Sequence, residues 1–115
     1  MKTKHIIKPA IASMLLLALA GGTTRAADTR ELWDKNCASC HGKDGRGDTK
    51  MGKKAEVKDY TDPKFQAEYK EDKGIKTIKE GLMENGKERM KPYADKFTDD
   101  EIKALAAYVR TFKKS

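Results

Sequence analysis

Hydrophobic side chains recur at the three- and four-residue spacing of a helix in three segments of this 115-residue chain. The first segment, residues 29–40, begins after a capping aspartate or threonine and ends at a glycine-rich stretch. The second, residues 72–84, carries Ile75, Ile78 and Leu82 on one face. It stops at an Asn-Gly pair, which suits a left-handed helix cap. The pattern therefore predicts two helices before the C-terminal region.

The third segment has the clearest start signal. Residues 98–101, TDDE, form a capping box, in which the threonine and the glutamate each satisfy a free amide of the first turn. A shorter helix is expected near residues 63–69, and residues 42–56, rich in glycine and lysine, are expected to form a long loop that wraps something. No run of alternating β-branched residues predicts a strand. We therefore predict an all-α fold of three main helices and one short helix.

The first 26 residues have the composition of a secretory signal. Lysines at the start are followed by an apolar run and by small residues before an expected cleavage after Ala26. The charge-free part, residues 9–24, is shorter than the roughly 20 residues that cross a bilayer, which disfavours a retained anchor. We expect a periplasmic or otherwise exported, soluble protein with residues 1–26 removed and one domain in residues 27–115.

Removal of this segment changes the charge of the protein. The whole chain has 25 basic and 18 acidic residues and a net charge of +7. The segment contains four basic and no acidic residues, so 21 basic residues remain against 18 acidic ones, a net charge of +3. The remaining charges are interspersed, which is typical of a solvated surface and weakens the case for nucleic-acid binding. A domain this small is expected to need a disulfide, a metal or a covalent cofactor for stability.

Both cysteines and one of the two histidines lie within the five residues CASCH, 37–41. On a helix, Cys37, Cys40 and His41 share one face of consecutive turns. Two thiols at this spacing can each bond to a vinyl group at one edge of a haem while the adjoining imidazole reaches the iron, so CxxCH is typical of c-type haem attachment. We predict one haem c bound covalently through both cysteines, with His41 as the proximal iron ligand.

Other uses of these residues need groups that the exported chain lacks. A zinc site takes four ligands, and no other cysteine or histidine remains once His5 leaves with the N-terminal segment. A thioredoxin-like pair needs a strand and a βαβ context. A disulfide between Cys37 and Cys40 would close only a four-residue loop and constrain little. A zinc- or disulfide-stabilised interaction module therefore stays a hypothesis only for a haem-free protein.

The histidine count also limits what can bind the other side of the iron. With a second histidine excluded, the choices are a methionine, a lysine or other weak ligand, or an open position. Met51 would require a sharp turn of the polar loop, and Met83 lies in the predicted helix 72–84, where methionine more often fills the core. Met90 stands in a segment that Pro92 keeps from becoming helical. We expect Met90 to be the distal ligand.

These motifs resemble those of the class I c-type cytochromes, the small soluble monohaem electron carriers, over nearly the whole chain after residue 26. Trp33 is similar to the family's aromatic residue four positions before the first haem cysteine, and DDEIKALAAYVR is similar to its C-terminal helix, with Leu105 and Tyr108 as packing residues. The resemblance implies crossing N- and C-terminal helices around the haem and a distal methionine near Met90, although Met-Lys-Pro replaces the usual Met-Pro. Thr29 stands where a glycine is usual.

The resulting hypothesis is a single-electron carrier, not an enzyme, that shuttles electrons between larger redox proteins as a monomer. We expect no nucleic-acid partner and no membrane insertion. Tyr60 and Arg89 are candidates for contacting the haem propionates. A filled sixth position on the iron leaves no room for a substrate. An open or displaceable distal site would instead indicate a small-ligand sensor or a weak peroxidase.

Overall fold

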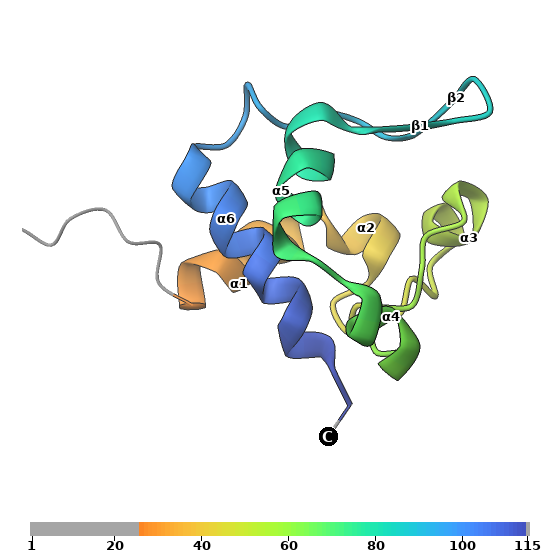
Figure 1. Cartoon of the computed structure of the whole chain (residues 1–115), viewed down its shortest axis with the longest axis horizontal. Coiled ribbons are helices and arrows are strands. Elements are labelled where there is room, and N and C mark those ends of the chain that lie inside the picture. The colour runs from red at the N-terminus through yellow and green to blue at the C-terminus, as the bar shows by residue number, and fades with distance from the viewer. Residues whose placement is uncertain (1–25, 115) are drawn as a thin grey trace, which may run out of the picture.

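The structure is a computed structural model that describes residues 26–114 (Figure 1). Residues 1–25, which hold nearly all of the predicted export signal, lie outside the described part. The elements follow one another as α1 (Ala26–Asn36), α2 (Ala38–His41), α3 (Lys50–Ala55), α4 (Pro63–Glu68), α5 (Glu71–Glu80), β1 (Leu82–Glu84), β2 (Lys87–Met90), α6 (Asp99–Tyr108) and the 3-10 helix η1 (Val109–Phe112). The predicted helical fold is confirmed, with the addition of a small two-stranded sheet.

The N- and C-terminal helices form the core. α6 packs against α1 and crosses it in Figure 1. Trp33 of α1 is 3% exposed, and its ring centroid lies 5.5 Å from that of Tyr108 on α6. Ile102 and Leu105, also on α6, are the largest fully buried side chains of the described residues. Leu105, which the family resemblance implied as a packing residue, therefore lies in the centre of the molecule.

The start of α6 follows the predicted capping box. The backbone N–H of Thr98 donates to the carboxylate of Glu101 over 2.9 Å, and the backbone N–H of Glu101 donates to Oγ1 of Thr98 over 3.2 Å. Three acidic residues in the first turn also complement the positive end of the helix dipole. This local chemistry fixes where the helix begins.

The second predicted helix ends earlier than its hydrophobic pattern indicated. α5 ends at Glu80 because Gly81, with φ of 76°, turns the chain out of the helix. β1 and β2 then pair antiparallel around Asn85 and Gly86, which have φ of 52° and 74°. Positive φ at both central residues is typical of a two-residue hairpin turn. The Asn-Gly pair closes a hairpin rather than a helix, and the expectation of no strand was wrong.

The first predicted helix is divided at Cys37. α1 ends at Asn36 and α2 begins at Ala38, yet the helical hydrogen bonds continue across the break. The N–H of Cys37 donates to the Trp33 carbonyl over 2.8 Å, and the N–H of His41 donates to the Cys37 carbonyl over 2.9 Å. The two cysteines and the histidine therefore still lie on consecutive turns.

The predicted loop 42–56 contains a helix of its own. α3 starts after Thr49, whose Oγ1 accepts a hydrogen bond from the N–H of Gly52 over 2.8 Å. The periodicity of apolar residues could not reveal this helix, because its sequence, KMGKKA, has only one large apolar side chain.

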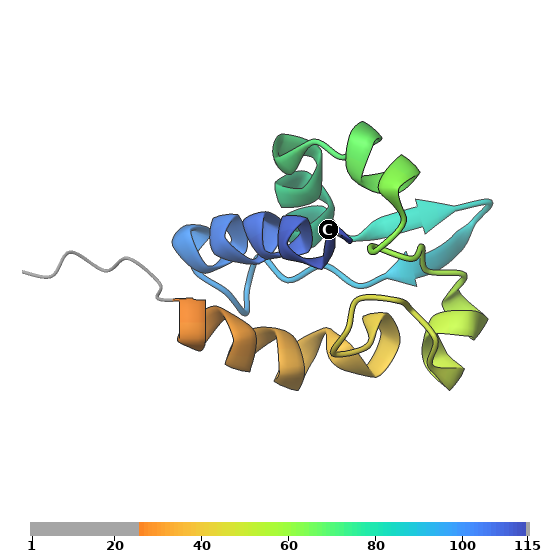
Figure 2. The same ribbon diagram turned by 90° about the horizontal axis from the view of Figure 1, so that it is seen from below.

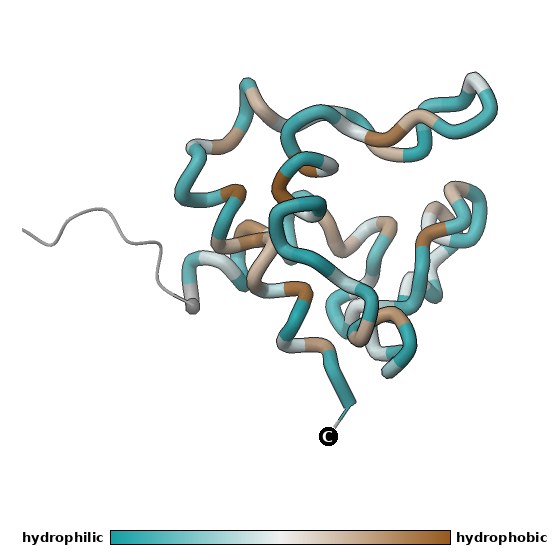
Figure 3. The backbone as a smooth tube through the Cα atoms, viewed as in Figure 1, coloured by the Kyte–Doolittle hydropathy of each residue, from teal (hydrophilic) through white to brown (hydrophobic). Residues whose placement is uncertain are grey.

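The elements enclose an interior space that both apolar and polar side chains line. Figure 2 shows α1 and α2 along one side, with α5 and the hairpin on the opposite side and α6 between them. Hydrophobic positions are scattered along the elements, and none of these elements is hydrophobic along its whole length (Figure 3). Within residues 26–114, no helix has the length and apolar character needed to cross a membrane.

Candidate haem site

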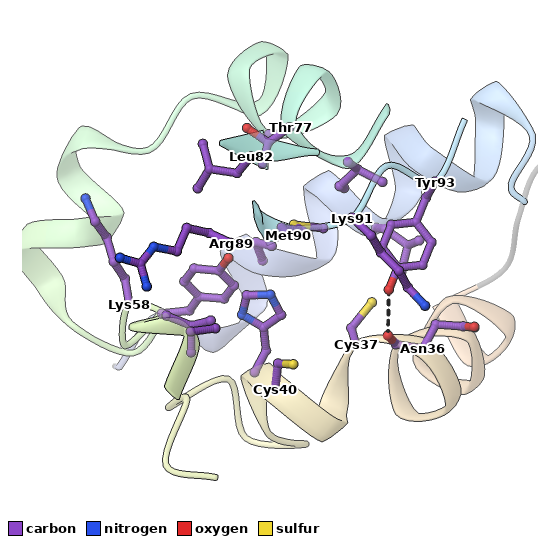
Figure 4. Close-up of a pocket in the computed structure, with 18 of the residues that line it drawn as sticks. Asn36, Cys37, Cys40, Lys58, Thr77, Leu82, Arg89, Met90, Lys91 and Tyr93 are labelled. Carbon is purple, nitrogen blue, oxygen red and sulfur yellow. Dashed lines mark hydrogen bonds between the residues drawn. The ribbon is translucent and has the colours of Figure 1, made fainter. Parts of the chain in front are cut away.

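A cavity of about 790 Å³ lies between α1–α2 and the hairpin side of the molecule. Its volume is within the roughly 300–1,000 Å³ typical of small-molecule and cofactor sites. Figure 4 shows Cys37 and Cys40 on one wall and Met90 on the facing wall. The cavity is lined by all six residues singled out from the sequence, namely Cys37, Cys40, His41, Tyr60, Arg89 and Met90.

The other two methionines are placed differently. Met83 lies on β1 instead of a helix, is 63% exposed and is not among the residues that line the cavity. Met51 lines the cavity from α3, but 56% of its surface is exposed. Met90 lies on β2 rather than in a loop, and it is partly buried against the core. Of the three thioethers, that of Met90 is the most enclosed.

The two cysteines are free thiols, each partly buried. Burial, with a smaller contribution from the neighbouring Cys40, raises the pKa of the Cys37 thiol to about 12. This thiol is therefore protonated and uncharged at neutral pH. Two unpaired sulfurs within one cavity wall fit the attachment of a haem through two thioether bonds.

His41 is held between two aromatic rings. Its ring centroid lies 5.0 Å from that of Tyr60, nearly parallel at 18°, and 5.6 Å from that of Trp33. Burial lowers the pKa of His41 to about 4, so the imidazole is neutral, the form that binds metals. Its Nδ1 is buried without a hydrogen-bond partner among the described residues, which is uncommon for a buried nitrogen. A buried, neutral imidazole of this kind can serve as a metal ligand.

The chain after His41 is anchored by contacts that the sequence did not reveal. Nε1 of Trp33 donates a buried hydrogen bond of 2.9 Å to the Gly42 carbonyl. Oγ1 of Thr49 donates to the Cys40 carbonyl over 2.8 Å, and a Cβ at Gly52 would collide with that same carbonyl oxygen. α3 therefore packs closely on the last turn of the CASCH segment. The capping threonine was the one sequence signal for this contact, because Thr49 precedes a short segment of helix-forming residues.

Arg89 and Lys58 lie at the same side of the cavity, which Tyr60 also lines (Figure 4). Tyr60 packs on His41, and burial raises the pKa of its phenol, which keeps the hydroxyl neutral. Arg89 is 17% exposed in its side chain and forms ion pairs with Glu56 at 3.4 Å and with Glu84 at 4.0 Å. Its Nε is buried without a hydrogen-bond partner among the described residues. Neither carboxylate was predicted from the sequence as a partner of Arg89.

Tyr93 closes the opposite side of the cavity. Its hydroxyl donates to the Asn36 carbonyl over 3.2 Å, beside Cys37 (Figure 4). The ring is 8% exposed and stacks on Phe97 at 5.2 Å between centroids. A lone aromatic residue directly after Pro92 in a polar stretch was the only sequence signal for this contact.

Two free thiols and a neutral imidazole on consecutive helical turns, facing a thioether across one cavity, define a protein that binds haem covalently. The family model for cytochrome c matches residues 26–113. The chain belongs to the cytochrome c family.

Curated relatives and solved structures agree with this membership. The chain is 31% identical over 105 residues to the chloroplastic cytochrome c6 of Chlamydomonas reinhardtii, a match that covers 87% of this chain and 65% of that protein. It is 33% identical over 111 residues to cytochrome c6 of Thermosynechococcus vestitus, covering 95% and 91%. Among solved structures, the KustC0563 c-type cytochrome has a TM-score of 0.65 at 33% identity, covering 75% of this chain and 98% of that one. A single-residue mutant of it has a TM-score of 0.66.

The cofactor of this chain follows from its membership of the family. Haem c, held covalently and carrying iron, is the cofactor of the cytochrome c family, which confirms the cofactor predicted from CASCH. Electron transfer is the activity of this family. The residues that hold the haem in this chain stay a prediction.

Proposed function

We propose that the protein is an exported carrier of single electrons whose haem c is attached through Cys37 and Cys40 and whose iron is bound by His41 and Met90. One observation carries this proposal: the CASCH segment and Met90 lie on facing walls of a single cavity. A neutral imidazole on one side and a thioether on the other are a common ligand pair of electron-carrying cytochromes.

The surroundings of these ligands favour electron transfer over chemistry on a substrate. Ile78, Leu82 and Leu105 add apolar surface to the cavity lining. A thioether ligand and an apolar environment both favour the reduced iron, because they disfavour the additional positive charge of the oxidised state. With His41 and Met90 both bound to the iron, no position on it would remain open to a substrate. The haem would supply electron transfer without bond formation, while these two residues hold its iron.

Tyr60 and Arg89 complete the proposed site as partners of the haem propionates. The buried Nε of Arg89 has no hydrogen-bond partner among the described residues, although its terminal Nη2 lies beside Glu56. A carboxylate of the cofactor would satisfy this nitrogen with a charge-assisted hydrogen bond. Tyr60 lines the same cavity and supplies a neutral hydroxyl.

The location and partners follow from the same proposal. A c-type haem is attached outside the cytoplasm of bacteria, which agrees with the signal predicted in residues 1–26. We propose a periplasmic monomer that accepts and donates electrons with larger redox proteins. The intact mass of purified protein should equal that of residues 27–115 plus one haem. A mass that includes residues 1–26 would contradict export with cleavage.

The ligand assignment is tested with Met90→Ala and its matched control Met83→Ala, both made in a strain that attaches haem. The wild-type oxidised protein should show low-spin bands and the weak near-infrared transition from sulfur to iron. This band should be lost in Met90→Ala and kept in Met83→Ala, because the Met83 side chain is exposed and does not line the cavity.

Two results would overturn the assignment. If the band survives in Met90→Ala, another sulfur is the ligand, and Met51 becomes the candidate. High-spin bands and rapid carbon monoxide binding in the wild-type protein would instead favour the open-site alternative, a small-ligand sensor or a weak peroxidase.

A further inference from the structure

Two contacts connect the hairpin side of the cavity to the opposite wall, one on either side of Met90. On one side, Tyr93 donates to the Asn36 carbonyl over 3.2 Å. On the other, Arg89 pairs with Glu56 at 3.4 Å. Figure 4 shows Arg89 and Tyr93 on opposite sides of Met90. The segment that carries the proposed distal ligand is therefore fastened at both ends.

The hairpin itself has little other support. All three residues of β1 and the first two of β2 are exposed, so only Arg89 and Met90 of the two strands are partly buried. The sheet consists of these two strands alone, and an isolated hairpin is marginally stable in water. The position of Met90 therefore depends on the contacts of its immediate neighbours.

Arg89 is suited to this role because its side chain is largely removed from water. It is 17% exposed, and a partly buried cation depends on nearby carboxylates for stabilisation. Glu84, on the partner strand, lies at 4.0 Å and belongs to the hairpin itself. Glu56 belongs to a different part of the chain, the C-terminal end of α3, where its backbone is left-handed with φ of 56°. Of these two pairs, the one with Glu56 joins the hairpin to the other wall.

We propose that Arg89 is a positioning residue: its ion pair with Glu56 fastens the hairpin to the end of α3 and so keeps Met90 at the iron. This inference rests on the proposed ligation by Met90. Loss of the pair frees the hairpin to move away, so an external ligand displaces Met90 more quickly. Salt should have the same effect, because mobile ions screen the attraction between partly exposed charges.

The test uses oxidised haem-loaded protein and imidazole in its neutral form, whose approach to the protein does not depend on charge. Glu56→Gln removes the pair and keeps the shape of the side chain. Its matched control is Glu88→Gln, because Glu88 lies on β2, lines the same cavity and has no ion pair among the residues that the structure describes. Stopped-flow absorption measures the rate of imidazole binding.

Imidazole should bind Glu56→Gln roughly two to five times faster than wild type, the factor expected for one ion pair of this exposure. Glu88→Gln should bind at the wild-type rate. Added salt should speed binding to the wild-type protein and should leave Glu56→Gln nearly unchanged. A purely structural role would not produce this loss of salt dependence.

The outcomes separate this inference from the ligand assignment. The sulfur-to-iron band, recorded before imidazole is added, reports whether Met90 is bound; its absence from wild type would refute the ligation itself. If the band is present but Glu56→Gln and Glu88→Gln bind imidazole equally fast, the positioning role of Arg89 is wrong. Should Glu56→Gln fail to fold, the wild-type salt series decides: a rate independent of ionic strength overturns the inference, and a rising rate supports it.

Discussion

The indole of Trp33 joins the N-terminal helix to the turn that follows His41. Its ring is in contact range of the aromatic side chains of His41, Tyr108 and Phe112, with centroids between 5.0 and 5.6 Å apart. Its Nε1 donates the buried hydrogen bond to the Gly42 carbonyl. One side chain therefore both packs the helix crossing and fixes the segment that carries the proposed proximal ligand.

Trp33→Phe should keep most of the packing and lose the hydrogen bond. The Gly42 carbonyl keeps the hydrogen bond of 3.2 Å from the backbone N–H of Gly45, so the free energy of unfolding of the haem-loaded protein should fall by about 0.5–1.5 kcal/mol, the net contribution of one hydrogen bond. Urea unfolding measures the change. Tyr108→Phe is the control, because it removes a polar group from a ring beside Trp33 that makes no hydrogen bond through its hydroxyl among the described residues. An equal loss in both variants would show that the indole N–H contributes little.

The roles of individual residues could be predicted from the sequence where these roles depend on spacing along one helix. The shared face of Cys37, Cys40 and His41 follows from helix geometry alone, and the structure keeps it across the break between α1 and α2. The acceptor of the Trp33 indole lies in the turn after the CASCH segment, and Glu56, one carboxylate partner of Arg89, lies 33 residues before it in the chain. Only the folded chain brings these groups together, so no local pattern could identify them.

At the scale of elements, α3 shows how a short helix with no apolar face is held in place. Thr49 caps its first turn and also donates to the Cys40 carbonyl. Gly52 is buried against that carbonyl, where a side chain would collide. Close approach between α3 and the CASCH segment therefore requires a residue without a Cβ.

Gly52→Ala should destabilise the protein, although replacing glycine by alanine within a helix is usually stabilising. In an exposed helix, alanine in place of glycine stabilises by roughly 0.5–1 kcal/mol. Here the new methyl group must push α3 away from Cys40, and overpacking of this kind costs about 1–3 kcal/mol. Chemical unfolding should therefore show a net loss of stability, whereas Lys54→Ala, an exposed change on the same helix, should stay within about 0.5 kcal/mol of wild type. A stabilised Gly52→Ala protein would contradict the close packing.

The elements that were not predicted from the sequence are those too short to show a periodic pattern of apolar residues. The apolar spacing of α5 continues into Leu82, so periodicity extended the helix, while the conformation of Gly81 ended it. Strands of three and four residues show no measurable alternation. The α6 start was predicted correctly because a capping box is a local signal with its own hydrogen bonds.

At the scale of the whole molecule, the cavity of the proposed haem site occupies much of the space that a hydrophobic core would otherwise fill. The cavity occupies about 790 Å³ in a domain of fewer than 90 described residues. At about 24 cal/mol per Å³, the cost found for cavities in apolar cores, an unfilled space of this size would cost on the order of 19 kcal/mol. Even a third of that figure, about 6 kcal/mol for a space partly open to water, is comparable with the lower part of the roughly 5–15 kcal/mol that stabilises a typical domain.

Protein that lacks haem should therefore lose its fixed tertiary structure. Residues 27–115 produced in the cytoplasm, where haem is not attached, should show weak near-ultraviolet circular dichroism and no cooperative thermal transition, while haem-loaded protein of the same residues shows both. The local signals of α6, its capping box and helix-forming residues, should preserve part of the far-ultraviolet helical signal. A sharp thermal transition in the haem-free protein would mean that α1 and α6 alone form a sufficient core, and that the cofactor adds function without completing the fold.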